Sequence, residues 1–493
     1  MSGDGQFKKR IAAAIVTIAV AGCAVGPDFK TPAGPDTNAY TARPLPPETA
    51  STAVTGGDAQ RLVPGGDIPA EWWSLFHSRE LDRLIRQALK DNPTLASAKA
   101  TLRQSQESVR AFIGSAFLPQ VNAEASAVRQ KISGAAFGQP QNEISPFTLY
   151  NASVTVSYAL DFFGGARREF EALRSQVDYQ QFQLEGAYLT LTGNIVTAAV
   201  QEAVLRAQVR AAQDIIASQE KQLAVVRKQY ELGAVSKTDL LAQSAQVAQT
   251  RATLPPLVKA LDQTRHLLAV LAGRLPSEGA TLPEFELEGF ELPRELPVSL
   301  PSLLVRQRPD IRSGESLLHA ASAQIGVATA NLYPQINLSG SYGSEALKTN
   351  ELFKSGSTVW SLGAGLIQPL FHGGELTAKR RAAIAAYDAA QAQYRLIVLQ
   401  AFQNVADVMR ALGADAETLK AQAEAEQAAR DTLDLTEKQF QIGAVSYLSL
   451  LNAERQYQES KLRLVQAQGA RFADTAALFQ ALGGGWWNKG KEE

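Results

Sequence analysis

The chain has 493 residues, 45% of them hydrophobic, which is enough apolar material for a sizeable core or for two to three ordinary domains. Its 48 basic and 49 acidic side chains nearly cancel, so we expect no nucleic-acid partner. With four histidines and one cysteine, the chain offers few candidates for metal binding or histidine-dependent catalysis and excludes an intrachain disulfide.

The first predicted element is a targeting segment at residues 1–22. Three basic residues at 8–10 precede an apolar run from Ile11 to Val20, which is too short to cross a bilayer as a helix. The tetrad that ends in Cys23, Val-Ala-Gly-Cys, resembles a bacterial lipobox, which implies that Cys23 is lipidated and becomes the mature amino terminus. The alternative is an ordinary secretory signal with an incidental cysteine.

The residues after Cys23 indicate where and how the protein is anchored. Ala24 and Val25 stand in place of the aspartate associated with inner-membrane retention, so we expect the outer membrane, contact with its lipid, and no cofactor apart from the covalent lipid. Residues 23–70 are rich in Pro, Gly and Thr and show no apolar periodicity, which predicts an extended tether.

Two very long helices are predicted from the distribution of proline. No proline occurs between Pro146 and Pro255, and none occurs after Pro369. Within these gaps, residues 166–232 and 376–442 consist mainly of strong helix formers. At 1.5 Å per residue each helix would reach about 100 Å, and the broad spread of its small apolar residues favours a ring or bundle with neighbours on two sides.

An internal duplication with a period of about 210 residues organises the chain. The segment Gly-Ala-Val-Ser occurs at 233–236 and again at 443–446, and the Pro-Gln-x-Asn and Phe-x-Gly-Gly segments recur in the same order. We therefore divide the chain into a first repeat at 71–275, an equatorial linker at 276–309, a second repeat at 310–482 and a carboxy-terminal tail at 483–493.

Each repeat contains a pair of predicted strands, near 119–130 and 150–160 in the first and near 334–342 and 358–368 in the second. Apolar and polar residues alternate in these segments, a pattern typical of transmembrane β-strands but also of a half-buried soluble sheet. Four strands cannot close a barrel, and an open sheet edge is not tolerated in lipid. If the strands cross the membrane, several chains must share one barrel.

The chain resembles the outer-membrane efflux factors of the TolC type, especially their NodT-type lipoprotein branch. The resemblance covers the whole mature chain and rests on the duplication together with short landmarks: Cys23 to Asp28, Trp72-Trp73, Arg308 to Arg312, Ile325 to Ala328 and Ala481 to Trp486. It implies a mostly α-helical homotrimer in which four strands per chain build a twelve-stranded transmembrane β-barrel, continued by a long α-helical barrel.

The resemblance also implies roles for particular residues. The helix turns at Gly233, Ala234, Val235 and Ser236 and at Gly443, Ala444, Val445 and Ser446 would form the periplasmic tip that docks onto an adaptor protein joined to an inner-membrane pump. Leu448, Asn452 and Asp239 match positions that constrict the tip. Asn452 stands where a carboxylate is usual, and Phe440 where relatives carry tyrosine, which predicts an altered closed state.

The function that follows is a passive exit duct of a tripartite efflux system for small molecules, without enzymatic activity. No nucleophile elbow, phosphate-binding loop or zinc-binding His pair is present in the sequence. Two alternatives remain open at this point: an outer-membrane duct for protein or peptide secretion, and a lipid-anchored periplasmic coiled-coil scaffold. The sequence does not name the cargo, the pump or the adaptor.

Overall fold

The computed structural model describes residues 24–133, 138 and 145–489, so the expected signal peptide and Cys23 lie outside the described part. The chain forms two compact units. The first contains the residues up to Pro32, Thr101–Gln180 and Gly314–Tyr394, and the second contains Ala33–Ala100, Gln181–Ser313 and the residues from Arg395 onward. Each unit draws on both sequence repeats, because the long helices pass from one unit into the other.

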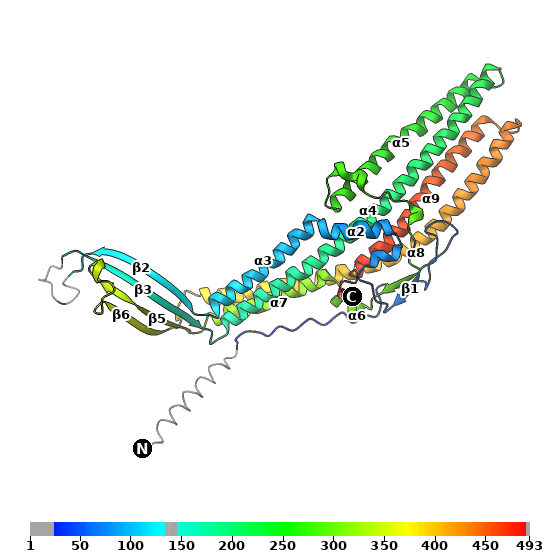
Figure 1. Ribbon diagram of the computed structural model, residues 1–493. Helices are drawn as coiled ribbons and strands as arrows, with labels where there is room; N and C mark the ends of the chain where they lie inside the picture. The colour runs from blue at the N-terminus through cyan, green and yellow to red at the C-terminus, as the bar shows by residue number, and fades with distance from the viewer. Residues whose placement is uncertain (1–23, 134–137, 139–144, 490–493) are drawn as a thin grey trace. The chain divides into compact units, whose positions relative to one another are not determined.

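The first unit contains an antiparallel sheet in the order β2-β3-β5-β6 (Figure 1). Its strands are β2 (Gln120–Gln130), β3 (Phe147–Leu160), β5 (Gln335–Ala346) and β6 (Thr358–Ile367). The hairpin β2-β3 comes from the first repeat and β5-β6 from the second. The contact between β3 and β5 joins the two, with Val154 opposite Tyr342 and Tyr158 opposite Leu338.

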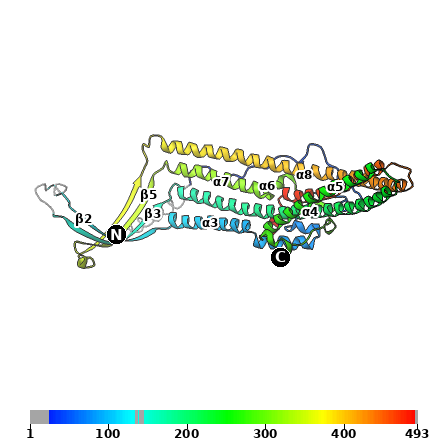
Figure 2. The ribbon, with the colours of Figure 1, turned by 90° about the horizontal axis from the view of Figure 1, so that it is seen from above.

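Four helices form two long hairpins of matching length. The helix α4 (Gly165–Glu231) is followed by α5 (Lys237–Leu271), and α8 (Glu375–Gln441) by α9 (Tyr447–Ala481), with 67 and 35 residues in each pair. Figures 1 and 2 show each pair closing through a short turn. The long helices begin and end within one residue of the expected 166–232 and 376–442. In the described part of the chain, no helix is both long and apolar enough to cross a bilayer.

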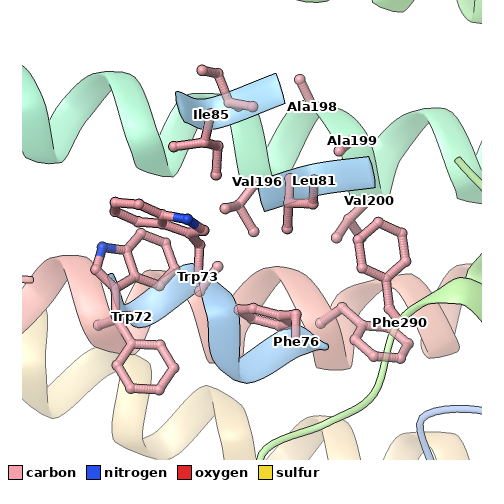
Figure 3. Close-up of a cluster of buried hydrophobic side chains, with 14 of the residues drawn as sticks. Trp72, Trp73, Phe76, Leu81, Ile85, Val196, Ala198, Ala199, Val200 and Phe290 are labelled. Carbon is pink, nitrogen blue, oxygen red and sulfur yellow. The ribbon is translucent and has the colours of Figure 1, made fainter. Parts of the chain in front are cut away.

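The main hydrophobic core lies in the second unit and is built around a short aromatic segment. The 3-10 helix η1 (Trp72–Phe76) and the helix α2 (Arg79–Asp91) bury Trp72, Phe76, Leu81 and Ile85 against α4 and α9 (Figure 3). Trp72 stacks on Phe479 with 5.4 Å between the ring centroids. Truncating such a buried aromatic side chain costs about 3–5 kcal/mol, so this cluster is a principal source of stability in the unit.

The remaining helices are shorter. The first unit includes parts of α3 (Pro93–Ala116) and α7 (Pro309–Ala330), which begin in the second unit. The linker contains η3 (Pro276–Thr281), η4 (Leu287–Gly289), the strand β4 (Glu295–Val298) and α6 (Pro301–Gln307). A short turn η5 (Thr349–Glu351) lies between β5 and β6, and η6 (Trp486–Asn488) follows α9.

The expected tether at 23–70 is only partly extended and solvated. Its strand β1 (Arg61–Pro64) pairs in parallel with β4 of the linker, and the fully buried Gln60 donates to the backbone oxygen of Pro293 at 3.1 Å. The hydroxyl of Tyr40 donates to the backbone oxygen of Ser299 at 2.8 Å. The expectation of a plain tether was therefore wrong for this part, because one short strand and isolated side chains, among them the fully buried Ile68, dock it without any apolar periodicity.

Candidate functional site

The four-stranded sheet has one apolar face. Residues directly opposite each other on neighbouring strands project to the same side, so the pairing aligns the even-numbered residues of β3, β5 and β6 with the odd-numbered residues of β2. This face carries a row that runs from Val121 through Val156 and Gly340 to Leu362. Another row ends in Tyr342 and Trp360, whose side chains are 66% and 69% exposed.

The opposite face of the sheet is polar. Its rows contain Asn122, Thr155, Ser341 and Ser361, and Ser341 and Ser361 share a hydrogen bond of 2.8 Å between their hydroxyl groups. Near one end, the amide of Asn151 donates to the carboxylate of Glu345 at 2.9 Å. A sheet with one apolar and one hydrophilic face suits a boundary between lipid and water.

Both outer edges of this sheet are left open. The strands β2 and β6 are the outermost strands, and within the described residues each pairs with a strand on one side only. Unpaired backbone groups on an edge strand offer a template for pairing with another chain. All residues of β6 are exposed, including the large apolar Leu362 and Leu366.

The residues that follow Cys23 are held against the first unit by a buried arginine. The side chain of Arg168 on α4 is 7% exposed and donates to the backbone oxygen of Val25 at 3.2 Å and to the carboxylate of Asp28 at 2.7 Å. Burial lowers the pKa of Arg168, but its hydrogen bonds and ion pairs with Asp28 and Glu171 outweigh this and raise it, so the guanidinium stays charged. The segment next to the expected lipid attachment point therefore has a defined place, although Cys23 itself lies outside the described residues.

Two further contacts fix the same segment. The ring of Phe29 stacks on His319 of α7 at a centroid distance of 4.3 Å, and the imidazole of His319 lies 2.8 Å from a carboxylate oxygen of Glu171. The backbone of Gly26 packs so tightly on Gly326 that a Cβ atom on either glycine would collide with its surroundings. These contacts explain the Gly26 and Gly326 positions in the sequence landmarks without assigning them a chemical role.

The two turns between the long and short helices have the same backbone geometry. Gly233 and Gly443 adopt left-handed conformations with φ of 75° and 73°. The amides of Ala234 and Ala444 each donate at 2.8 Å to a backbone oxygen five residues earlier, on Gln229 and Gln439. Glycine is required here because a side chain strains this conformation, which is the usual end of a helix.

The next helices begin with serine caps that differ between the two turns. Ser236 accepts from the amide of Asp239 at 3.2 Å, and the Asp239 carboxylate accepts from the Ser236 amide at 3.0 Å. Ser446 instead accepts from the amide of Ser449. The carboxylate of Asp239, expected at a constriction, is therefore engaged within its own turn. Val235 and Val445 are half-buried, while the other residues of both turns are exposed.

The residues expected to constrict the tip are exposed at the start of α9. Leu448 is 65% exposed, so it does not pack between helices of its own chain, and Asn452 is exposed one turn later. The apolar residues before each glycine, Leu232 and Ile442, are 74% and 80% exposed. Exposed apolar side chains grouped at helix ends are typical of contact surfaces.

Two contacts join the hairpins, and the sequence alone did not reveal them. The hydroxyl of Tyr447 donates to the side-chain oxygen of the fully buried Gln243 on α5, and the guanidinium of Arg455 donates to Gln246 at 2.9 Å. Burial raises the pKa of Tyr447, which keeps its hydroxyl protonated as a donor. The ring of Tyr447 also packs on the ring of Phe440, the residue that stands where relatives carry tyrosine, with 5.4 Å between the ring centroids.

A family model described as outer membrane efflux protein matches residues 84–274 and 300–484, well over half of the chain. The chain belongs to the outer membrane efflux protein family. Its curated relatives include the pyoverdine export outer membrane protein OpmQ of Pseudomonas aeruginosa, 32% identical over 420 residues that cover 84% of this chain and 87% of OpmQ. The cation efflux system protein CusC of Escherichia coli is 26% identical over 476 residues, covering 96% and 97% of the two chains.

Solved structures show the same fold. The outer-membrane channel OprN matches with a TM-score of 0.83 and 28% identity, covering 94% of this chain and all of the OprN chain. The MtrE outer membrane channel of Neisseria gonorrhoeae matches with a TM-score of 0.80 and 25% identity, covering 94% and 99%. The family and the mostly helical fold expected from the sequence are confirmed. The protein is an outer-membrane efflux channel, which removes the scaffold alternative.

Proposed function

We propose that three copies of this chain join edge to edge to form a passive exit duct for small molecules. The observation that carries the proposal is the sheet of the first unit, which combines a continuous apolar face with two open edges. Lipid offers no hydrogen bonds to the backbone groups of an open edge, so β2 of one copy must pair with β6 of another. Three copies with four strands each give a closed barrel of twelve strands.

The number of copies follows from family resemblance, and the strand count limits the alternatives. One chain has fewer strands than the smallest bacterial barrels, which have about eight, so at least two copies are needed. A larger barrel has a wider lumen. The polar face, with its serine and asparagine rows, then lines a water-filled path through the membrane.

The anchor and the tip complete the duct. A lipid on Cys23 would lie two residues before Val25, which Arg168 holds beside the start of α4. The turns at 233–236 and 443–446 would dock onto a periplasmic adaptor that connects to an inner-membrane pump. Their identical backbone geometry and the exposed Leu232 and Ile442 support a docking surface with two equivalent parts.

The relatives support small molecules as cargo rather than secreted proteins. The printed names of similar proteins refer to pyoverdine export, toluene efflux and cation efflux, which are chemically unlike one another. A wide polar lumen selects little, so the choice of cargo falls to the pump. The duct itself needs no catalytic group and no energy source.

The native mass of the detergent-extracted protein tests this proposal. A Cys23→Ala variant with a cleavable signal removes the lipid, so any remaining need for detergent reports on the apolar sheet face alone. We expect a detergent-dependent trimer. A dimer or tetramer would contradict the twelve-stranded barrel, and a water-soluble monomer would overturn the duct altogether.

A further inference from the structure

A small, partly open cavity in the second unit lies between the two hairpins. It has a volume of about 140 Å³ and is lined by residues of α4, α8 and α9. The residues that matter for its chemistry are Asp214 and Gln219 of α4, Glu437 of α8, and Glu454, Tyr457 and Lys461 of α9. Glu454 lies seven residues after the start of α9, about 10 Å along the helix.

Two side chains in the cavity wall are buried without hydrogen-bond partners among the described residues. Gln219 is 2% exposed, and neither its amide nitrogen nor its amide oxygen has a partner. Glu454 is 8% exposed, and its Oε2 is also unpaired. The Gln219 amide lies near the Glu454 carboxyl group but makes no hydrogen bond of ordinary geometry with that oxygen. Leaving buried polar groups unsatisfied destabilises the protein, so the cavity favours an occupant that can bind them.

The charges around the cavity are unbalanced toward the negative. Three carboxyl groups line it, from Asp214, Glu437 and Glu454, against one ammonium group, from Lys461. Lys461 is also drawn to Glu426 outside the cavity, at 3.8 Å. Burial and the neighbouring Glu437 raise the pKa of Glu454 to about 7, which shows how poorly this carboxylate is solvated.

We propose that this cavity binds a small organic cation that carries N–H donors, such as a primary ammonium or a guanidinium group. The cation would donate to Glu454 Oε2 and to the amide oxygen of Gln219, and its charge would offset the carboxyl groups. Among the described residues, the three carboxyl groups of the lining do not form a group that could hold a metal ion, which favours an organic cation. A charge-assisted hydrogen bond to a buried carboxylate is roughly twice as strong as a neutral one.

The first repeat lacks this arrangement at the equivalent place. Shifting by the repeat of 210 residues replaces Glu454, Glu437 and Gln219 with Ser244, Arg227 and Ala429. The cavity is thus a feature of one side of the hairpin pair and not a by-product of the duplicated fold. A cation held between α4 and α9 would tie the first hairpin to the second, independently of how many chains assemble.

Equilibrium dialysis of radiolabelled methylammonium and guanidinium against the full-length protein in detergent tests the proposal. We expect saturable binding of one cation per chain at pH 8. Tetramethylammonium has the same charge but no N–H donor, so it should compete at least tenfold more weakly. An absence of saturable binding, or equal competition by tetramethylammonium, would overturn the site.

Matched variants locate the binding. Glu454→Gln should weaken binding at least tenfold, while Glu459→Gln, an exposed carboxylate on the same helix, should leave it unchanged. Gln219→Ala serves as a second variant that keeps every charge, and it should weaken binding severalfold. If both cavity variants bind as well as the unchanged protein, the cation binds elsewhere and the proposal fails.

The pH dependence gives a separate readout. Only the ionised form of Glu454 offers the cation an opposite charge, and with a pKa of about 7 its ionised fraction falls about tenfold between pH 8 and pH 6. The apparent affinity should fall by about the same factor, and this fall should vanish in Glu454→Gln. Asp214 and Glu437 also face the cavity, so a pH dependence that persists in Glu454→Gln would assign the effect to them and contradict the role of Glu454.

Discussion

The two hairpins have the same length but contribute differently to the packing of the second unit. The helices α5 and α9 each have 35 residues and follow turns of identical backbone geometry, yet seventeen residues of α9 are buried against six of α5. The helix α9 carries Tyr447, Glu454 and the fully buried Arg471, whereas the equivalent positions of α5 are Lys237, Ser244 and Leu261. The duplication thus preserved the backbone, and the side chains of the second copy acquired the contacts that hold the unit together.

The largest expected effect is at Arg471. Its guanidinium donates to the backbone oxygens of Leu412 at 3.1 Å and Asp58 at 2.9 Å, which joins α9 to α8 and to the amino-terminal segment. Arg471→Leu installs the residue of the first copy and removes these hydrogen bonds from a fully buried position, so we expect the free energy of unfolding to fall by about 3 kcal/mol. Thermal unfolding in detergent measures it. Arg463→Leu, at an exposed ion pair, should cost less than 1 kcal/mol, and an equal effect of both would contradict the anchoring role.

The second largest effect is expected at the hydrogen bond between the hairpins, from the hydroxyl of Tyr447 to the side chain of Gln243. Tyr447→Phe removes the donor to Gln243 and leaves a fully buried amide oxygen unsatisfied, at a cost of about 1–3 kcal/mol. We expect the hairpins to separate more readily and the conductance of the protein in planar bilayers to rise severalfold. Tyr230→Phe changes an exposed tyrosine of the first hairpin and serves as the control. Equal conductance of the two variants would show that this hydrogen bond does not restrict the tip.

The serine caps should differ modestly between the two hairpins. Ser236→Ala breaks a reciprocal pair of bonds with Asp239, whereas Ser446→Ala breaks the single bond from the Ser449 amide. We expect each to destabilise its helix start by about 1 kcal/mol, with the larger loss at Ser236. Hydrogen exchange in the first turns of α5 and α9 measures this difference. A larger increase in the exchange rate at α9 in Ser446→Ala than at α5 in Ser236→Ala would contradict the expected order.

The smallest effect is a pH dependence confined to the second copy. Burial and the neighbouring Asp474 raise the pKa of Asp415 to about 7 from its ordinary 3.8, and the equivalent residues of the first copy are Leu205 and Thr264. Between about pH 4 and pH 7 the carboxyl group of Asp415 is therefore protonated in the folded state and ionised in the unfolded state. The free energy of unfolding falls as pH rises through this range and is level above it. Because the Asp415 carboxyl group is half exposed, we expect its titration to change the free energy of unfolding by only about 1 kcal/mol.

Thermal midpoints at pH 5 and pH 8 measure that contribution. Since Glu454 titrates in the same range, the comparison is between Asp415→Asn and the unchanged protein, with Asp431→Asn as an exposed control. The pH slope should be smaller in Asp415→Asn alone. An unchanged slope would show that Asp415 is already ionised in the folded protein.

Much of this architecture was predictable because it rests on local patterns. Proline-free stretches and helix formers located α4 and α8 to within a residue, and the repeated Gly-Ala-Val-Ser located both turns. Alternation predicted the four strands because their two faces meet different surroundings. Such signals depend on residues that are close together in the sequence, so they can be recognised from a single sequence.

The side-chain contacts between distant segments were not predictable in this way. Nothing near Arg471 indicates that it reaches Asp58, more than 400 residues earlier, or that Tyr447 would meet Gln243. The docking of 33–70 was missed for the same reason, since Gln60 and Tyr40 are single polar residues without a pattern. The roles expected for Leu448, Asn452 and Asp239 at a constriction stay predictions, and Asp239 also takes part in the cap of its own helix.

Cross-linking of the open sheet edges tests the shared barrel most directly. Each edge variant carries two introduced cysteines. One replaces Ser126 in the middle of β2, and the other replaces either Ser361 or Gly363 in β6, so that the edges of two chains can form a disulfide. Ser157 and Ser339, paired within one chain, give the control. We predict covalent dimers and trimers only from the edge variants. Edge variants that stay monomeric while the control pair closes within its chain would contradict a barrel built from several copies.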